Sequence, residues 1–213
     1  MLKKGSLAVI IAFLIIINLA FINNANASVQ KVDDKGQVKI INKKTMTSAE
    51  KLELIDNYQE KYFTIINRNH LFINTVDSED FDQIDKDRKE LKKLFAEVQK
   101  QVKNKKYLKK YKAIEKRYSK CNETTTIKMN EFAQKNYNEI DNLLNEVYKE
   151  VKSKISSEDF AKLTISEQKW LKEVKNYKKV FDSKNFGTIG TIIYYDYEIN
   201  MREFRTLLLM LYL

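Results

Sequence analysis

One long amphipathic run restricts what this chain can fold into. Between Met129 and Ile155, apolar residues recur at steps of three and four over about seven turns, which is the period of a helix with one face on a core. The residues of this stripe are Met129, Phe132, Ala133, Tyr137, Ile140, Leu144, Val147, Tyr148, Val151 and Ile155. The run therefore predicts one helix that packs along its length against other helices.

The remainder of the sequence favours the same fold class. The 213 residues include no proline and only four glycines, so few positions would end a helix. Shorter apolar stripes with helical spacing occur on both sides of the long run, within 52–66, 84–102, 108–118, 160–181 and 189–211. We predict an all-α protein: a helical hairpin or small bundle followed by a three-helix domain.

The expected boundaries between helices follow from caps and from the phase of the stripes. Thr47 or Ser48 should begin the first helix, and Ser157 should cap a later one. A turn at 104–106 would resolve a phase slip, and the glycines in 181–191 indicate a loop. The final run LLLMLYL is apolar all round, which predicts that it is buried.

The N-terminus has the pattern of a secretory signal peptide. Lys3 and Lys4 precede the apolar run 7–22, and Ala25-Asn26-Ala27 fits a cleavage site after residue 27. An uncleaved membrane anchor is the less favoured alternative, because spanning a bilayer takes about 20 apolar residues. No cysteine follows the run to carry a lipid anchor. We expect an exported protein, periplasmic or extracellular.

Charge and composition divide the remaining chain. Residues 28–47 lack helical spacing and are predicted to be a flexible leader. Residues 48–120 form a basic helical region, whereas the lysines, arginines and acids of 121–213 balance to zero net charge. The lysines of 99–120 are candidates for binding an anionic envelope polymer or membrane surface, above all Lys105, Lys106, Lys109 and Lys110. A solvated helix face explains the same lysines, and an exported protein seldom meets nucleic acid.

The sequence contains no recognisable catalytic or metal-binding constellation. The only histidine is His70 and the only cysteine is Cys121, which argues against Ser-His or Cys-His catalysis and against a histidine-rich metal site. No glycine-rich phosphate loop is present. We therefore predict a protein that is not an enzyme and that needs no cofactor or metal.

Asp141 stands out because it lies on the apolar face of the long helix. Tyr137, Asp141, Leu144 and Tyr148 lie within about 60° of one another around a helix axis. A buried carboxylate without a partner costs several kcal/mol, so Asp141 needs a cationic partner or a functional role.

The second half of the chain resembles the lysozyme inhibitor LprI-like family. The similarity covers 121–213 and begins with the order Cys121, Thr126, Met129-Asn130, Ala133, Tyr137, Asp141, Leu144-Asn145 and Val147-Tyr148-Lys149. It continues with Leu163, Gln168-Lys169-Trp170, the loop 187–191 and Arg205-Thr206 to Leu209. The resemblance implies a small exported helical protein whose structural motif comprises Tyr137, Asp141, Leu144, Asn145, Tyr148, Trp170 and Arg205.

The resemblance also implies a function and a partner. Members of the family include inhibitors of lysozyme, so the expected partner is a protein such as lysozyme or another muramidase; the alternative is an envelope adaptor that uses the basic helix. The family's paired cysteines are not conserved in this chain, where Phe132 stands at one cysteine position and could replace the bridge by packing. We expect Asp141 to pair with Arg205, with Tyr137, Tyr148 and Trp170 around them.

Overall fold

The computed structural model describes residues 46–72, 80–182 and 190–213. Within these ranges every regular element is a helix, in agreement with the predicted all-α class. The helices are α2 (Ser48–Phe72), α3 (Asp80–Gln101), α4 (Lys105–Tyr118), α5 (Thr126–Lys154), α6 (Ser157–Asp182) and α7 (Gly190–Met210). The expected signal peptide and residues 28–45 of the expected leader lie outside the described residues.

Side-chain caps fix several helix starts. Thr47 caps α2, because its hydroxyl accepts a hydrogen bond from the Glu50 N–H while the Glu50 carboxylate accepts one from the Thr47 N–H. Asn104 caps α4, because its side-chain oxygen accepts a hydrogen bond from the Tyr107 N–H. The break between α3 and α4 covers 102–104, so it lies earlier than the expected turn at 104–106, and Lys105 and Lys106 already belong to α4. The cap of α6 is Ser156 rather than the predicted Ser157, because the Ser156 hydroxyl is the one that accepts from the Asp159 N–H.

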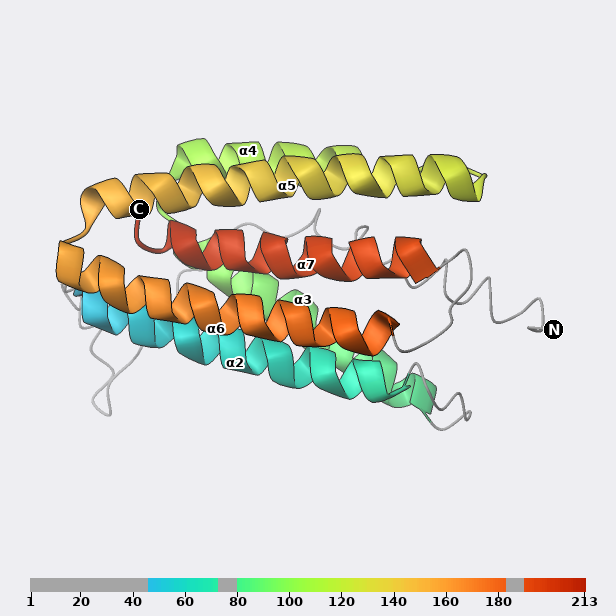
Figure 1. The fold of residues 1–213 in the computed structure, drawn as a ribbon, viewed down its shortest axis with the longest axis horizontal. Coiled ribbons are helices and arrows are strands. Elements are labelled where there is room, and N and C mark those ends of the chain that lie inside the picture. The colour runs from blue at the N-terminus through green and yellow to red at the C-terminus, as the bar shows by residue number, and fades with distance from the viewer. Residues whose placement is uncertain (1–45, 73–79, 183–189) are drawn as a thin grey trace, which may run out of the picture.

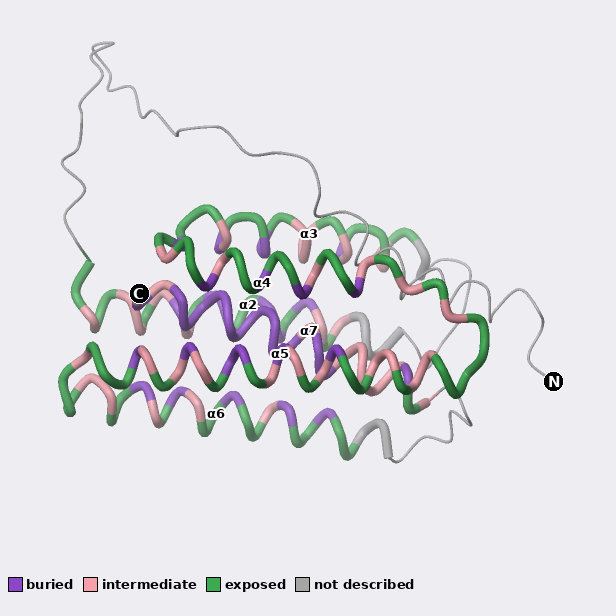
Figure 2. The backbone as a smooth tube through the Cα atoms, turned by 90° about the horizontal axis from the view of Figure 1, so that it is seen from above, coloured by how far each residue is buried: buried purple, intermediate pink, exposed green. Residues whose placement is uncertain are grey.

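Helix α7 occupies the centre of the molecule. It contacts each of the other five described helices, and its most extensive contact is with α5 (Figure 1). Helix α4 runs along α5, while α2 packs against both α3 and α6. In Figure 2 the buried residues gather on α7 and on the sides of the other helices that face it.

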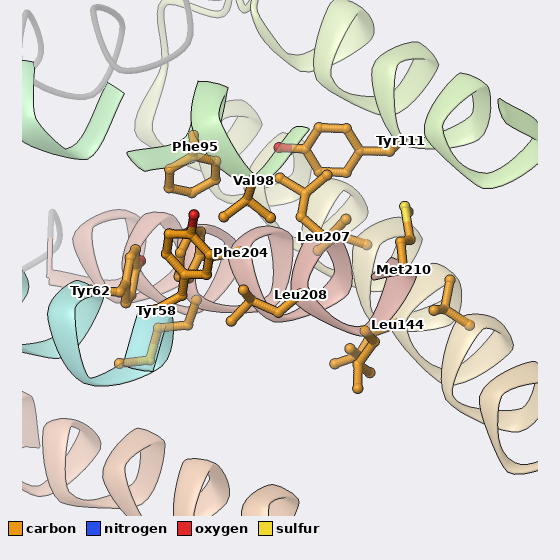
Figure 3. Packing of buried hydrophobic residues seen from close by; sticks show 14 of the residues in the cluster. Tyr58, Tyr62, Phe95, Val98, Tyr111, Leu144, Phe204, Leu207, Leu208 and Met210 are labelled. Carbon is orange, nitrogen blue, oxygen red and sulfur yellow. The ribbon is translucent and has the colours of Figure 1, made fainter. Parts of the chain in front are cut away.

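The hydrophobic core forms around the C-terminal half of α7. Phe204, Leu207 and Leu208 are fully buried, and the whole segment 201–210 is buried, as the apolar run at the C-terminus predicted. The Phe204 ring stacks on Tyr62 of α2 at 4.6 Å between centroids and lies 4.9 Å from Phe95 of α3. Figure 3 shows these rings together with residues of α3, α4 and α5, so side chains from both halves of the sequence share one core.

A search of the described helices for membrane-spanning segments found none of sufficient length and hydrophobicity. The apolar run 7–22 was not part of that search, because it lies outside the described residues.

Candidate functional site

Three of the residues singled out from the sequence, Tyr137, Asp141 and Trp170, lie around one arginine of α7. Asp141 lies on α5 with its side chain 36% exposed, and it pairs with an arginine of α7. That arginine is Arg202: its Nε donates to Asp141 Oδ1 at 2.8 Å. The expected Asp141–Arg205 pair is therefore wrong, although the expectation that Asp141 pairs with a basic residue of the last helix is correct.

Arg202 is held by more than Asp141. Its side chain is 10% exposed and forms an ion pair with Glu198, one turn earlier on α7, whose own side chain is 4% exposed. A further nitrogen donates to the Tyr137 hydroxyl at 2.8 Å, and the guanidinium carbon lies 4.4 Å from the centre of the Tyr137 ring. The Trp170 ring centre is 5.9 Å away, within cation–π range.

The electrostatics of this cluster keep Arg202 charged. Burial alone would lower the pKa of Arg202, but the negative charges of Glu198 and Asp141 outweigh burial and raise it. Two carboxylates share one guanidinium, and the Tyr194 hydroxyl donates to Glu198 at 2.7 Å. Burial and this hydrogen bond raise the pKa of Tyr194 above its ordinary value. The cluster therefore works as an α5–α7 clasp, which we define by Tyr137, Asp141, Glu198 and Arg202.

Arg205 forms a second clasp with different helices. Its side chain is fully buried, and its guanidinium pairs with Glu167 of α6 at 2.6 Å and donates to the Ser166 hydroxyl at 3.0 Å. Ser166 in turn donates to Asp56 of α2 at 2.6 Å. Arg205 cannot take the place of Arg202, because three residues along a helix turn a side chain by about 300°. Arg205 therefore faces α6 and α2 while Arg202 faces α5.

The other motif residues support packing. Leu144 is buried in the core, and the Asn145 side chain donates to the Asp141 carboxylate at 3.0 Å. Trp170 is buried beside Arg202 as expected. Tyr148 instead packs on Phe160 of α6, with ring centres 5.5 Å apart.

An aromatic contact lies close to Cys121, where α4 meets α5. Cys121 is a free, partly buried thiol. The Phe132 ring lies edge-on to Tyr118 at 4.9 Å between centroids, and Tyr118 is buried. This contact joins the end of α4 to the first turns of α5, so the expected packing of Phe132 is confirmed, whereas its replacement of a bridge stays a prediction.

The lysines of α4 are partly neutralised by α5. Lys110 pairs with Glu146 at 2.6 Å and Arg117 pairs with Glu139. Lys105, Lys106 and Lys109 are exposed, and Lys106 lies 4.8 Å from the centre of the Tyr107 ring. Residues 183–189 of the expected glycine-containing loop lie outside the described residues.

Sequence reasoning missed Glu198, Arg202 and the role of Glu167. The signal was present, because Glu198 and Arg202 stand four residues apart in α7, a spacing that favours an ion pair. Their partners on α5 depend on how α7 is rotated, and the sequence of α7 does not specify that rotation.

Comparison with known proteins matched the C-terminal part of the chain to one family model. Residues 118–209, from the end of α4 almost to the end of α7, match the family model described as Lysozyme inhibitor LprI. The match confirms the resemblance expected for 121–213. No curated protein and no solved structure matched the chain.

Proposed function

We propose that this protein is an exported, non-enzymatic inhibitor that binds a lysozyme or a related muramidase. The observation that supports the proposal is the match of residues 118–209 to the lysozyme inhibitor family. The α5–α7 clasp and the Arg205 clasp hold three helices of that region together, so the motif residues maintain the fold and the partner binds exposed residues elsewhere.

The mode of inhibition that suits such a protein is occlusion. A rigid helical protein that covers the sugar-binding cleft of a muramidase needs shape complementarity and no chemistry of its own. Because residues 121–213 carry no net charge, long-range attraction contributes little, and affinity has to come from close contacts.

Lysozyme activity on two substrates tests the proposal. Full-length protein is added to lysozymes of several structural classes, first with suspended bacterial cells and then with a soluble oligosaccharide substrate. An inhibitor of the enzyme slows both reactions and binds the enzyme in calorimetry. If micromolar excess slows neither reaction for any class and no heat of binding is seen, the proposal is refuted.

The soluble substrate also distinguishes enzyme inhibition from a second candidate function, which is binding of an anionic envelope polymer through α4. Exposure of Lys105, Lys106 and Lys109 favours this candidate, whereas pairing of Lys110 with Glu146 weakens it. A protein that coats the cell wall protects cells but does not slow hydrolysis of the soluble substrate. That protection falls with salt and with charge reversal at Lys105, Lys106, Lys109 and Lys110.

A further inference from the structure

A groove opens on the surface where the end of α4 meets α5, two helices that lie side by side (Figure 1). Its volume is about 550 Å³, which is in the range of ligand sites in proteins. Its lining comes from the last turns of α4, the turn that follows and the early turns of α5. No residue of either clasp lines it, so the groove is a feature that the clasps do not explain.

The apolar part of the lining consists of two aromatic rings and an alanine. Tyr118 and Phe132 lie edge-on to each other at 4.9 Å between ring centroids. Tyr118 is buried, whereas Phe132 is only partly buried and Ala113 is exposed. Because the alanine side chain ends at Cβ, position 113 does not fill the groove. The aromatic pair therefore keeps a side that a ligand can cover.

The charged part of the lining is entirely basic. Lys116, Arg117, Lys120 and Lys135 line the groove, and none of the lining residues, all within the described part of the chain, is acidic. Arg117 pairs with Glu139, whereas the three lysines form no ion pair with another described residue. Positive charge is therefore in excess around an apolar surface.

Helix stability explains only part of this charge. Lys116 and Arg117 lie in the last turn of α4, where a cation interacts favourably with the helix dipole. Lys120 lies beyond that helix and Lys135 lies within α5, so the dipole of α4 accounts for neither. Like charges around one hollow repel one another, and an anionic ligand removes that repulsion.

The combination of rings and lysines discriminates between classes of anion. A phosphate polymer has no apolar group to cover the Phe132 ring, and a flat membrane surface does not enter a hollow between two helices. An acidic peptide segment offers carboxylates together with an apolar side chain, so it matches both parts of the lining. Lysine is a flexible point charge, so carboxylates at several positions along such a segment can reach it.

We propose that this groove binds an acidic segment of a protein partner. An apolar side chain of the segment lies against Phe132 and Tyr118, and the flanking carboxylates face Lys116, Lys120 and Lys135. Arg117 contributes less, because Glu139 already holds it. The groove selects its ligand by this chemistry alone, so the proposal does not require that the partner be a muramidase.

Peptide binding to the full-length protein tests the groove. The probe is a fluorescein-labelled synthetic peptide with a central tryptophan flanked by glutamates, followed by fluorescence anisotropy at low ionic strength. Replacing the tryptophan by alanine, or the glutamates by glutamines, should weaken binding about tenfold or more. Equal binding of the glutamine peptide, or no saturable binding of the original peptide up to about 1 mM, would overturn the proposal.

Substitutions assign the binding to the groove. Lys135→Glu should weaken peptide binding about tenfold, and Ala113→Glu should do the same by placing a carboxylate in the hollow. Both positions are exposed, so both variants should fold, which thermal unfolding checks. Lys105→Glu is the matched control, because it makes the same change of net charge as Lys135→Glu at the opposite end of α4. An equal loss in the control, or wild-type binding by both groove variants, contradicts the proposal.

Competition separates the peptide from other sources of negative charge. Unlabelled peptide, inorganic polyphosphate and phosphatidylglycerol vesicles are each added to the preformed complex at matched concentrations of charge. The unlabelled peptide should displace the probe at the lowest concentration, because only it also covers Phe132. Displacement by polyphosphate or by vesicles at an equal or lower concentration would assign the groove to that anion and overturn the proposal.

Discussion

Removing Arg202 should cost far more than removing Asp141, although the two side chains form one ion pair. Asp141 is 36% exposed, whereas Glu198, the other partner of Arg202, is 4% exposed. Arg202→Gln leaves the Glu198 carboxylate buried without a counter-charge, a defect that costs about 3–5 kcal/mol. At about 2–4 °C per kcal/mol for a domain of this size, Tm falls by about 10 °C.

Asp141→Asn leaves Arg202 paired with Glu198 and with the Tyr137 hydroxyl. The lost pair is partly solvated, so the expected cost is about 1 kcal/mol. A third variant tests the cause directly: Glu198→Gln added to Arg202→Gln removes the stranded charge and should recover part of the lost stability. All three are compared by urea unfolding at neutral pH.

Two results would refute this reasoning. The first is a cost of Asp141→Asn equal to or greater than that of Arg202→Gln, and the second is no recovery in the double variant. If Asp141→Asn leaves stability unchanged and abolishes binding of a muramidase, Asp141 belongs to the binding surface rather than to the clasp.

Three further changes probe other parts of the fold. Asn104→Ala removes the cap of α4 and should lower the free energy of unfolding by about 1 kcal/mol in urea titrations. Asn104→Asp should keep most of the wild-type stability, because aspartate also caps helices. Tyr107→Phe deletes the 2.6 Å hydrogen bond to Glu150 and should cost about 1 kcal/mol, measured the same way. Asp196→Asn should stabilise the protein above about pH 7 and lose that advantage towards about pH 4, because burial raises the pKa of Asp196; a constant difference at all pH values would contradict this.

The sequence predicted the helices well because their signals are local. The stripe from Met129 to Ile155 corresponds to α5, and the phase slip near Asn104 corresponds to the gap between α3 and α4. Caps are also local signals. Ser156 and Ser157 are adjacent and either could cap α6, and the prediction chose Ser157 where the structure has Ser156.

Tertiary partners were predicted less well, for a physical reason. Both Arg202 and Arg205 lie on the last helix, and the apolar run around them gives no stripe from which to judge which side faces α5. Glu203 has the same difficulty: a glutamate in a helix is usually solvated, and its burial follows from the central position of α7. In a helix that is covered on every side, the buried charged residues show which side faces which neighbour, because each needs a partner there.

The central position of α7 also determines when this protein can fold. The ribosome makes α2 to α6 before α7, so five described helices emerge while the surface that they bury does not yet exist. Helices of this length are marginal in water without tertiary packing, and contacts such as Tyr62 with Phe204 span most of the described chain. Folding of these helices therefore waits until α7 has been made.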